Sequence, residues 1–203
     1  MSDHTPPEIL IAISRIKFMR ALLPIGIVIF AFIIQQGLQL SSARYLSILA
    51  LVYYLIILLV FRINRTVSLP EEDTLISPIN GKVTDIRTEK NEHIVEIKKL
   101  FYQPADVRLS DSADVSSEVV TSYNKQWIKK SELIFTNAER KTSWSLSGRN
   151  IYYFFETMRK KGGLTAIIPG NGSCTLRLSD QYHLNIQQGD KLEAGSSIIG
   201  TSL

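Results

Sequence analysis

Two long apolar runs precede a series of short alternating segments. Residues 21–34 and 45–61 contain no charged side chain, and a polar stretch around Gly37 separates them. The second run has 17 residues, near the lower limit for crossing a hydrocarbon core of about 30 Å, and the first reaches that limit when residues 35–40 are included. The pattern predicts a transmembrane helical hairpin over residues 21–61. A buried hairpin of a soluble protein and a hairpin that enters only one leaflet remain alternatives.

Basic side chains flank the outer ends of the two runs: Arg15, Lys17, Arg20, Arg62 and Arg65. The connecting turn carries only Arg44. By the positive-inside rule, this distribution places both termini on the cytoplasmic side of an inner or cytoplasmic membrane. Residues 8–20 mix Ile and Phe with basic residues, so residues 1–20 are predicted to form a separate interfacial segment.

From residue 74 onward, short runs rich in β-branched and aromatic residues alternate with turn residues, after a linker over residues 62–73. The predicted strands lie within 74–86, 92–99, 105–110, 117–123, 132–137, 141–147, 150–158, 163–169, 173–179, 182–187 and 196–202. Helix is expected only over 125–131 and 156–161. Many short strands at even spacing predict a mainly β domain over residues 74–203, a sandwich or barrel on the cytoplasmic side.

The first and last parts of this domain are similar in design. The segment "ISPINGKVTDI" opens it and "GDKLEAGSSIIG" nearly closes it. Gly189-Asp190 and Gly195 are turn positions, while Leu192 and Ile198-Ile199 are predicted to point to the core. We expect the two segments to lie together, as they do in barrel-sandwich domains.

Charge and composition exclude several function classes. The formal net charge of +4 is not gathered in a stripe of basic and aromatic residues, so we expect no nucleic-acid partner. The single cysteine, Cys174, excludes an internal disulfide framework and suits a reducing compartment. The three histidines are scattered and no Cys or His has metal-ligand spacing, so no metal site is expected.

Five segments resemble, in order and spacing, the phosphatidylserine decarboxylase family, particularly its short bacterial and archaeal form. The family's "FFRDPxR..P" corresponds to "VFRINRTVSLP", and its "SPADGKV" to "SPINGKV". Its "F..PFDVHVNRAPVDGxV" corresponds to "LFYQPADVRLSDSADVSSEV", and "Y..GKFL.A....NER" to "YNKQWIKKSELIFTNAER". Finally, "GDxVxxGxxIG" appears as "GDKLEAGSSIIG". The resemblance implies a barrel-sandwich-like decarboxylase-type domain preceded by a two-helix transmembrane hairpin.

The family's chemistry identifies what this chain lacks. Its members form a pyruvoyl group by cutting the chain before the serine of a Gly-Ser motif near the C-terminus, and an Asp and a His assist that serine. The Asp corresponds to Asn80 and the His to Arg108, neither of which serves as a base. The Arg-Ala-Pro that follows corresponds to residues 111–113. The expected Gly-Ser position falls just after Leu203. The resemblance therefore implies a degenerate site without catalytic residues and without a cofactor.

One alternative keeps a nucleophile. Gly195-Ser196 is itself a Gly-Ser dipeptide, and a shifted alignment would make Ser196 the serine that is converted to a pyruvoyl group. Such a shift breaks the "GDxVxxG" match and leaves Asn80 and Arg108 unexplained. A separate polypeptide that supplies the missing segment is a further alternative.

Three hypotheses follow for the function. The first is a membrane-anchored, catalytically inactive relative that binds a lipid headgroup or acts as an accessory or scaffold subunit, with other membrane subunits or further copies of itself as partners. Arg108 would then pair with a phosphate or carboxylate, unless it is a solvated surface residue, and Arg159, Lys160 and Lys161 would contact anionic headgroups. The second is an active pyruvoyl-dependent decarboxylase that forms phosphatidylethanolamine. The third is a membrane-fusion-type adaptor, which requires a long helical hairpin between the two similar segments.

Overall fold

The computed structural model describes residues 2–4, 6–38, 43–64, 66–68, 73–111, 115–123, 129–137, 142–154 and 161–202. The chain forms two compact units. The helical unit is Pro6–Phe61, and the β unit combines Met1–Thr5 with Arg62–Leu203.

The helical unit is a hairpin of two helices, α1 (Pro7–Leu38) and α2 (Ala43–Val60). Both are long and apolar enough to cross a membrane, with mean hydropathies of 2.1 and 2.2. At 1.5 Å per residue α1 is about 48 Å long and α2 about 27 Å. Residues 8–20, expected as a separate interfacial segment, are the first part of α1 and continue without a break into the apolar run. No glycine or proline lies between Pro7 and Pro24, so nothing ends the helix before it enters the apolar run.

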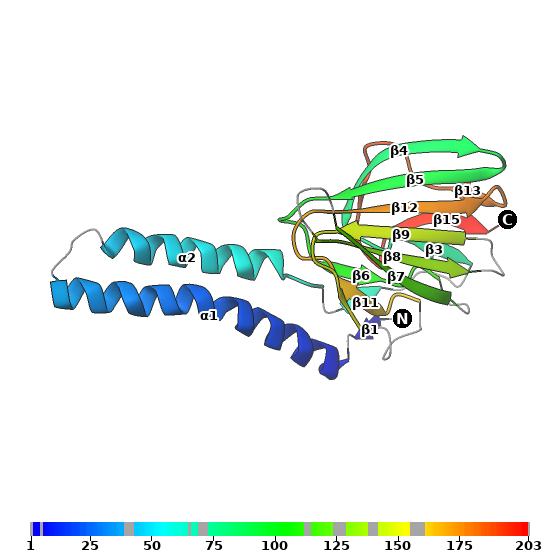
Figure 1. Ribbon diagram of the computed structural model, residues 1–203. Coiled ribbons are helices and arrows are strands. Elements are labelled where there is room, and N and C mark those ends of the chain that lie inside the picture. The colour runs from blue at the N-terminus through cyan, green and yellow to red at the C-terminus, as the bar shows by residue number, and fades with distance from the viewer. Residues whose placement is uncertain are drawn as a thin grey trace. The chain divides into compact units, whose positions relative to one another are not determined.

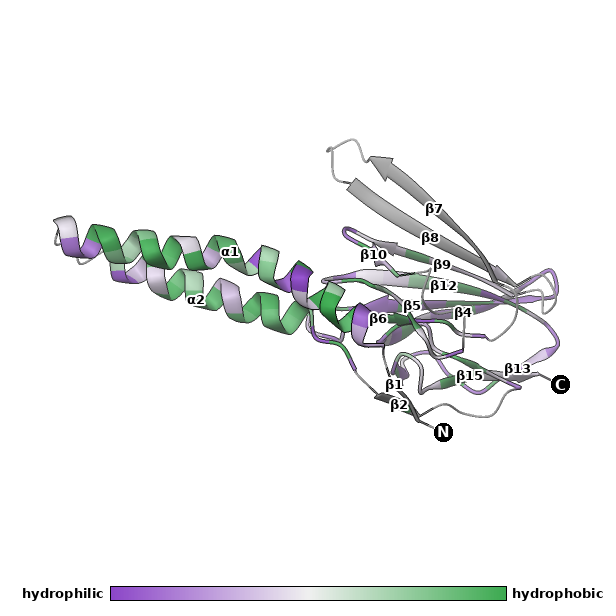
Figure 2. Ribbon diagram, turned by 90° about the horizontal axis from the view of Figure 1, so that it is seen from below, coloured by the Kyte–Doolittle hydropathy of each residue, from purple (hydrophilic) through white to green (hydrophobic). Residues whose placement is uncertain are grey.

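Small residues lie where the two helices pack together. Ala43, Ala50 and Ile57 are the buried residues of α2, and their spacing of seven places them on one stripe. Alanines allow two helices to approach closely. The remaining surface is exposed and apolar, and Figure 2 shows hydrophobic residues along most of both helices. In each apolar window only 17% of the residues are buried, which disfavours the alternative of a hairpin hidden in a soluble core.

The β unit is built from short antiparallel strands (Figure 1). The strands are β1 (Ser2–His4), β2 (Thr66–Ser68), β3 (Thr74–Ile76), β4 (Gly81–Glu89), β5 (Glu92–Lys99), β6 (Asp106–Arg108), β7 (Val115–Tyr123), β8 (Lys129–Asn137), β9 (Thr142–Gly148), β10 (Tyr152–Tyr153), β11 (Leu164–Ile167), β12 (Gly172–Ser179), β13 (Tyr182–Leu184), β14 (Lys191–Leu192) and β15 (Ile198–Ser202). Every predicted strand segment overlaps at least one of them, so the expectation of a β-rich domain is confirmed.

The largest sheet has seven strands in the order β14-β4-β5-β12-β9-β8-β7. Two three-stranded sheets, β10-β11-β6 and β13-β15-β3, contribute the other side of the core. The expected helix at 125–131 is wrong for residues 129–131, which belong to β8, and its other residues and 156–160 lie outside the described part of the chain.

The core is built from the alternate side chains of each strand that face inward. On β5, Val95 and Ile97 are buried, and they pack with Leu176 of β12 and Leu146 of β9. Residues from the small sheets, among them Val107, close the same cluster. A pleated strand points alternate side chains to opposite faces, so one face of the seven-stranded sheet supplies the core.

The two similar segments of the sequence lie together, as predicted. β14 pairs with the start of β4, with Lys191 opposite Lys82 and Leu192 opposite Gly81. β15 pairs with β3, with Ile198 opposite Ile76. The early and late parts of the β unit are therefore joined by two strand pairs.

The chain leaves and re-enters the β unit at one place. β1 pairs with β2, and His4 lies opposite Thr66. β1 precedes the helical hairpin and β2 follows it, so the two connections to the hairpin begin from paired strands. β2 lies within the predicted linker, residues 62–73, and β1 within the predicted interfacial segment.

Candidate functional site

The turn before β4 is held against β6. The Ser77 hydroxyl donates a hydrogen bond to the Ile79 carbonyl at 2.8 Å, and the Arg108 backbone amide donates to the Pro78 carbonyl at 2.8 Å. Ile79 forms an isolated bridge with Val107. A side chain on Gly81 would lie 2.6 Å from Ile97 Cγ2, so only glycine allows this approach to β5. These contacts place Asn80 beside the first residue of β6.

Asn80 is buried and uses both ends of its amide. Its Nδ2 donates to Asp106 Oδ1 at 2.9 Å and to the Pro104 carbonyl at 3.3 Å. Its Oδ1 accepts a hydrogen bond from the Ala194 backbone amide at 3.2 Å. An aspartate here would face the Asp106 carboxylate without a donor, and two adjacent carboxylates resist joint ionisation. Asparagine therefore suits a site that already contains one buried acid.

Arg108 is buried, with 2% of its surface exposed, and it joins three segments of the chain. Its Nε donates to Asp106 Oδ2 at 3.2 Å. Its Nη1 donates to the Gly162 carbonyl at 2.7 Å and its Nη2 to the Asn64 carbonyl at 2.6 Å. The alternative of a solvated surface arginine is wrong. The guanidinium fits here because backbone carbonyls and one carboxylate supply acceptors in several directions.

The loop that contains Ser196 lies against this arginine. Gly195 has φ +79°, and a side chain there would lie 2.5 Å from Arg108 Cδ and 2.8 Å from Val67 Cγ1. The Gly195 amide donates to the Ser77 carbonyl at 2.8 Å. The charged group packed on the Gly195-Ser196 dipeptide is thus a guanidinium, which does not accept a proton from a serine.

Asp106 is the centre of what we call the Asp106 cluster: Asn80, Asp106, Arg108 and Gly195. Burial raises the pKa of Asp106, while Arg108 and the hydrogen bond from Asn80 act in the opposite direction and favour the carboxylate. Both carboxylate oxygens accept hydrogen bonds within the cluster. Asn80 and Arg108 thus serve as donors to one buried carboxylate, and neither of these two side chains can accept a proton from a serine.

Lys99 is a buried residue that sequence analysis missed. Its Nζ donates a hydrogen bond to the Gly170 carbonyl at 2.8 Å. The charge of Asp106 also attracts it electrostatically. Alternation along β5 places Lys99 on the same face as Val95 and Ile97, and that pattern would have predicted its burial.

Lys99 is expected to make the stability of the β unit depend on pH. Burial lowers the pKa of Lys99 from 10.5 to about 8, although the attraction of Asp106 raises it. Between these values the unfolded chain binds more protons than the folded chain, so the free energy of unfolding should rise from pH 8 to 10.5, by up to roughly 3 kcal/mol. Urea unfolding should show that Lys99→Met loses this rise. The exposed Lys98→Met is the control, and equal pH dependence in both variants would contradict the assignment.

Of the three basic residues predicted to contact headgroups, the structure describes Lys161. Lys161 is buried and its Nζ donates to the Thr74 hydroxyl at 3.0 Å. Arg159 and Lys160 lie outside the described residues, as do Ser112 and Ala113 of the degenerate motif. Within the described ranges, no group of three or more His, Cys, Asp or Glu side chains is placed to hold a metal ion.

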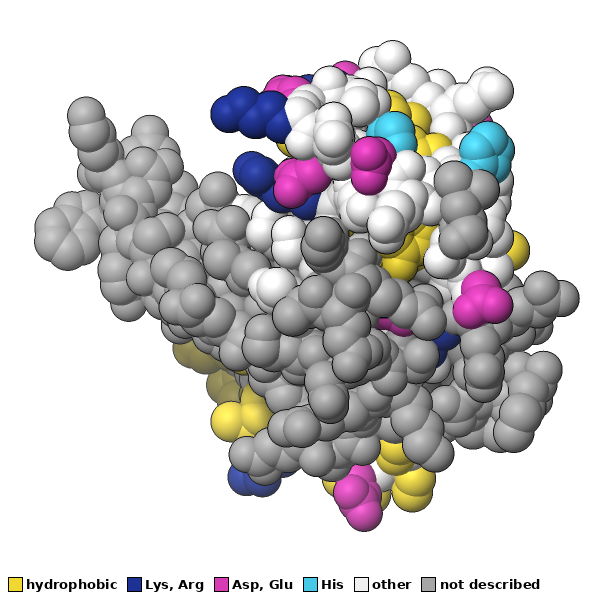
Figure 3. All heavy atoms as spheres, turned by 90° about the vertical axis from the view of Figure 1, so that its right-hand side faces the viewer, with side chains coloured by type: hydrophobic (Ala, Val, Ile, Leu, Met, Phe, Trp, Pro, Cys, Tyr) yellow, Lys and Arg dark blue, Asp and Glu magenta, His cyan; other side chains and the backbone are white. Residues whose placement is uncertain are grey.

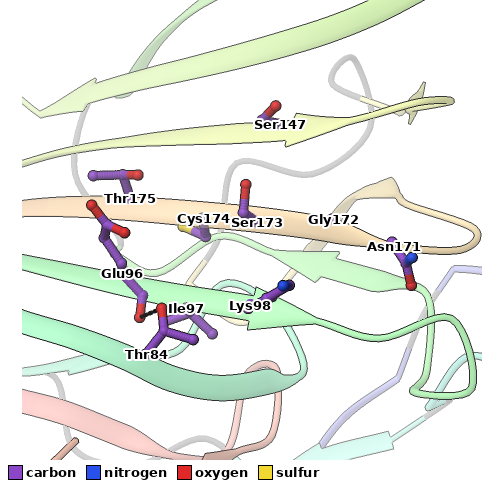
Figure 4. A pocket seen from close by; sticks show the side chains of 10 residues that line it. All are labelled: Thr84, Glu96, Ile97, Lys98, Ser147, Asn171, Gly172, Ser173, Cys174 and Thr175. Atoms are coloured by element: carbon purple, nitrogen blue, oxygen red, sulfur yellow. Dashed lines mark hydrogen bonds between the residues drawn. The ribbon is translucent and has the colours of Figure 1, made fainter.

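The outer face of the large sheet carries a shallow hollow of about 340 Å³ (Figure 4). Its lining comes from β4, β5, β9, β12 and the turn before β12: Thr84, Glu96, Ile97, Lys98, Ser147, Asn171, Gly172, Ser173, Cys174 and Thr175. Thr84 donates a hydrogen bond to the Glu96 carbonyl at 3.1 Å. The hollow is open and lies on the face opposite the core.

Exposed charges of both signs are mixed on the β unit. Arg87 lies 3.3 Å from Glu89 and from Glu96, and 3.8 Å from Asp85. Figure 3 shows basic and acidic side chains next to one another on the face in view.

A scan against protein-family models found no match to this chain, and searches of the curated proteins and of the solved structures found none either.

Proposed function

We propose that this protein is a membrane-anchored, catalytically inactive relative of the phosphatidylserine decarboxylases that serves as an accessory or scaffold subunit of a membrane complex. The observation that carries the proposal is the Asp106 cluster. Asn80 and Arg108, the residues at the positions of the family's Asp and His, both bond to the same buried carboxylate. Asn80 and Arg108 thus hold segments of the chain together at the positions where the family's Asp and His assist the serine.

The convergence of distant positions supports the resemblance. Asn80, Arg108 and Gly195 are far apart in the sequence, but in the structure Asn80 and Arg108 both bond to Asp106 and Gly195 packs on Arg108. These are the positions that the family's motifs would bring to one site. A chance similarity in short motifs gives no reason for such contacts.

The contacts of Arg108 favour a scaffold over a headgroup-binding site. All three nitrogens of the guanidinium donate hydrogen bonds to protein acceptors, and the side chain is enclosed. A phosphate or carboxylate from outside would have to displace Asp106 or two backbone carbonyls. The adaptor hypothesis is disfavoured because the described residues between 84 and 188 form strands and turns.

The membrane anchor is the helical hairpin. Two apolar helices joined by a short connection cross a bilayer and return, so their outer ends lie on the same side. The pairing of β1 with β2 supports this topology. The segment before α1 and the segment after α2 are thereby attached to neighbouring strands of the β unit. The positive-inside rule makes that side cytoplasmic, with Arg15, Lys17, Arg20 and Arg62 near the surface.

An activity measurement tests the proposal against the active alternative. The full-length protein is reconstituted in vesicles that contain phosphatidylserine, and phosphatidylethanolamine is followed by mass spectrometry. We expect no product above that of protein-free vesicles, and the same result for Ser196→Ala. Product formation that Ser196→Ala abolishes would establish an active decarboxylase and overturn the proposal.

A further inference from the structure

The loop between β5 and β6 exposes three consecutive large apolar side chains. Leu100, Phe101 and Tyr102 are 38%, 49% and 50% exposed. In the described part of the β unit, Ile198 is the other large apolar residue with comparable exposure. A soluble surface normally scatters such residues singly, so a contiguous group calls for a partner. We call residues 100–102 the aromatic loop.

The aromatic loop has a defined shape. The Leu100 amide donates to Gln103 Oε1 at 2.7 Å, and the Gln103 amide donates back to the Leu100 carbonyl at 3.0 Å. The rings of Phe101 and Tyr102 meet edge to face, with 5.6 Å between their centroids. The exposed rings are therefore held in place by a closed turn, as in a preformed contact surface.

The loop lies close to the residue at which the chain enters the β unit after α2. The Ala105 amide donates a hydrogen bond to the Arg62 carbonyl at 2.6 Å, and α2 ends at Val60. Tyr102 is three residues from Ala105, which limits their separation to about 11 Å. If α2 crosses a bilayer, Arg62 lies at its surface, and the aromatic loop lies within reach of the same surface.

Basic side chains surround the end of the sheet from which the loop emerges. Lys191, Lys82 and Lys98 are neighbours across β14, β4 and β5, and all three are exposed. Arg149 is also exposed and follows the end of β9, which lies at the same end of the sheet. Asp190 adds one negative charge next to Lys191. The negative surface potential of anionic lipid attracts basic side chains that lie near the bilayer.

We propose that the aromatic loop inserts into the headgroup region of an anionic bilayer, with Lys82, Lys98, Lys191 and Arg149 contacting anionic headgroups. Aromatic rings concentrate at the membrane–water interface because one part of the ring is apolar and another is polar. The loop and the hairpin then hold the β unit at the bilayer by two independent contacts. This inference rests on the proposed membrane anchor.

The test uses an environment-sensitive fluorophore on the full-length protein. Cys174 is buried, so Phe101→Cys or Tyr102→Cys introduces one accessible thiol for labelling with nitrobenzoxadiazole. The matched control, Glu89→Cys, lies at the opposite end of β4 and is exposed. The proteins are reconstituted in vesicles of phosphatidylcholine with 30% phosphatidylglycerol, and quenching by aqueous iodide is measured. We expect several-fold weaker quenching at positions 101 and 102 than at position 89.

The outcomes separate this inference from the membrane anchor. Vesicle flotation at alkaline pH reports the hairpin, and loss of flotation would overturn the anchor itself. Flotation with equal quenching at positions 89, 101 and 102 would overturn only the insertion of the loop. Vesicles of pure phosphatidylcholine should restore part of the quenching, and unchanged protection there would overturn the contribution of the basic residues.

Discussion

Replacing Arg108 by methionine is expected to lower the free energy of unfolding of the β unit by about 3–5 kcal/mol. Methionine fills much of the space of the arginine stem but removes the donors to Asp106, Gly162 and Asn64. The Asp106 carboxylate would then remain buried with only Asn80 as a side-chain donor. Urea unfolding of the full-length protein in detergent, followed by circular dichroism, measures the change. The rate at which Cys174 becomes reactive to a thiol reagent reports opening of the same core.

The control for this variant is an arginine with more ion pairs and less burial. Arg87 faces three carboxylates, but about half of its side chain is exposed. Exposed pairs contribute about 0–1 kcal/mol, so Arg87→Met should change stability little. Adding Asp106→Asn to Arg108→Met should recover part of the loss, because it removes the unpaired charge. Equal losses for Arg108→Met and Arg87→Met would contradict a structural role for the Asp106 cluster.

A methyl group at Gly195 is expected to lower the free energy of unfolding by roughly 2–4 kcal/mol. The residue has a left-handed backbone, and the added Cβ would lie 2.5 Å from Arg108 and 2.8 Å from Val67. Gly195→Ala therefore combines backbone strain with displacement of the buried arginine. The same unfolding measurement applies.

Gly170 provides the matched control for this effect. Its φ is +93°, but a Cβ there meets no atom within 4 Å. Gly170→Ala should therefore show only the backbone cost, about 1–2 kcal/mol. Should the two variants lose the same stability, the packing of Gly195 on Arg108 would not be significant.

Local patterns in the sequence were sufficient for most strands of the β unit and for the contact between its early and late segments, but not for β1, β2 or β14. Alternating residues and turn dipeptides located the strands, and the segments around Gly81 and Gly195 pair as expected. The boundary expected after residue 20 is not a helix boundary, because the charge pattern changes along residues 8–34 while the helix continues. Nothing between Pro7 and Pro24 ends a helix.

Two members of the candidate site were predictable, but its central acid, Asp106, and its chemistry were not. The motifs identified Asn80 and Arg108, yet the acceptors of Arg108 at Gly162 and Asn64 are backbone carbonyls, which no side-chain pattern marks. A sequence also does not distinguish an arginine that faces solvent from one that is enclosed. The alternation of inward and outward residues along β5 was sufficient to predict that Lys99 is buried. The residue was overlooked because a charged side chain is not expected at an inward position.

The most direct test of an inactive site is the intact mass of the purified, detergent-solubilised protein, measured before and after treatment with hydroxylamine. We expect one species of 22.9 kDa that forms no carbonyl adduct, because Asn80 and Arg108, at the positions of the family's Asp and His, cannot take a proton from a serine. A shortened chain together with a fragment whose first residue is a hydroxylamine-reactive pyruvoyl group would contradict the account and establish self-cleavage at Ser196 or another serine.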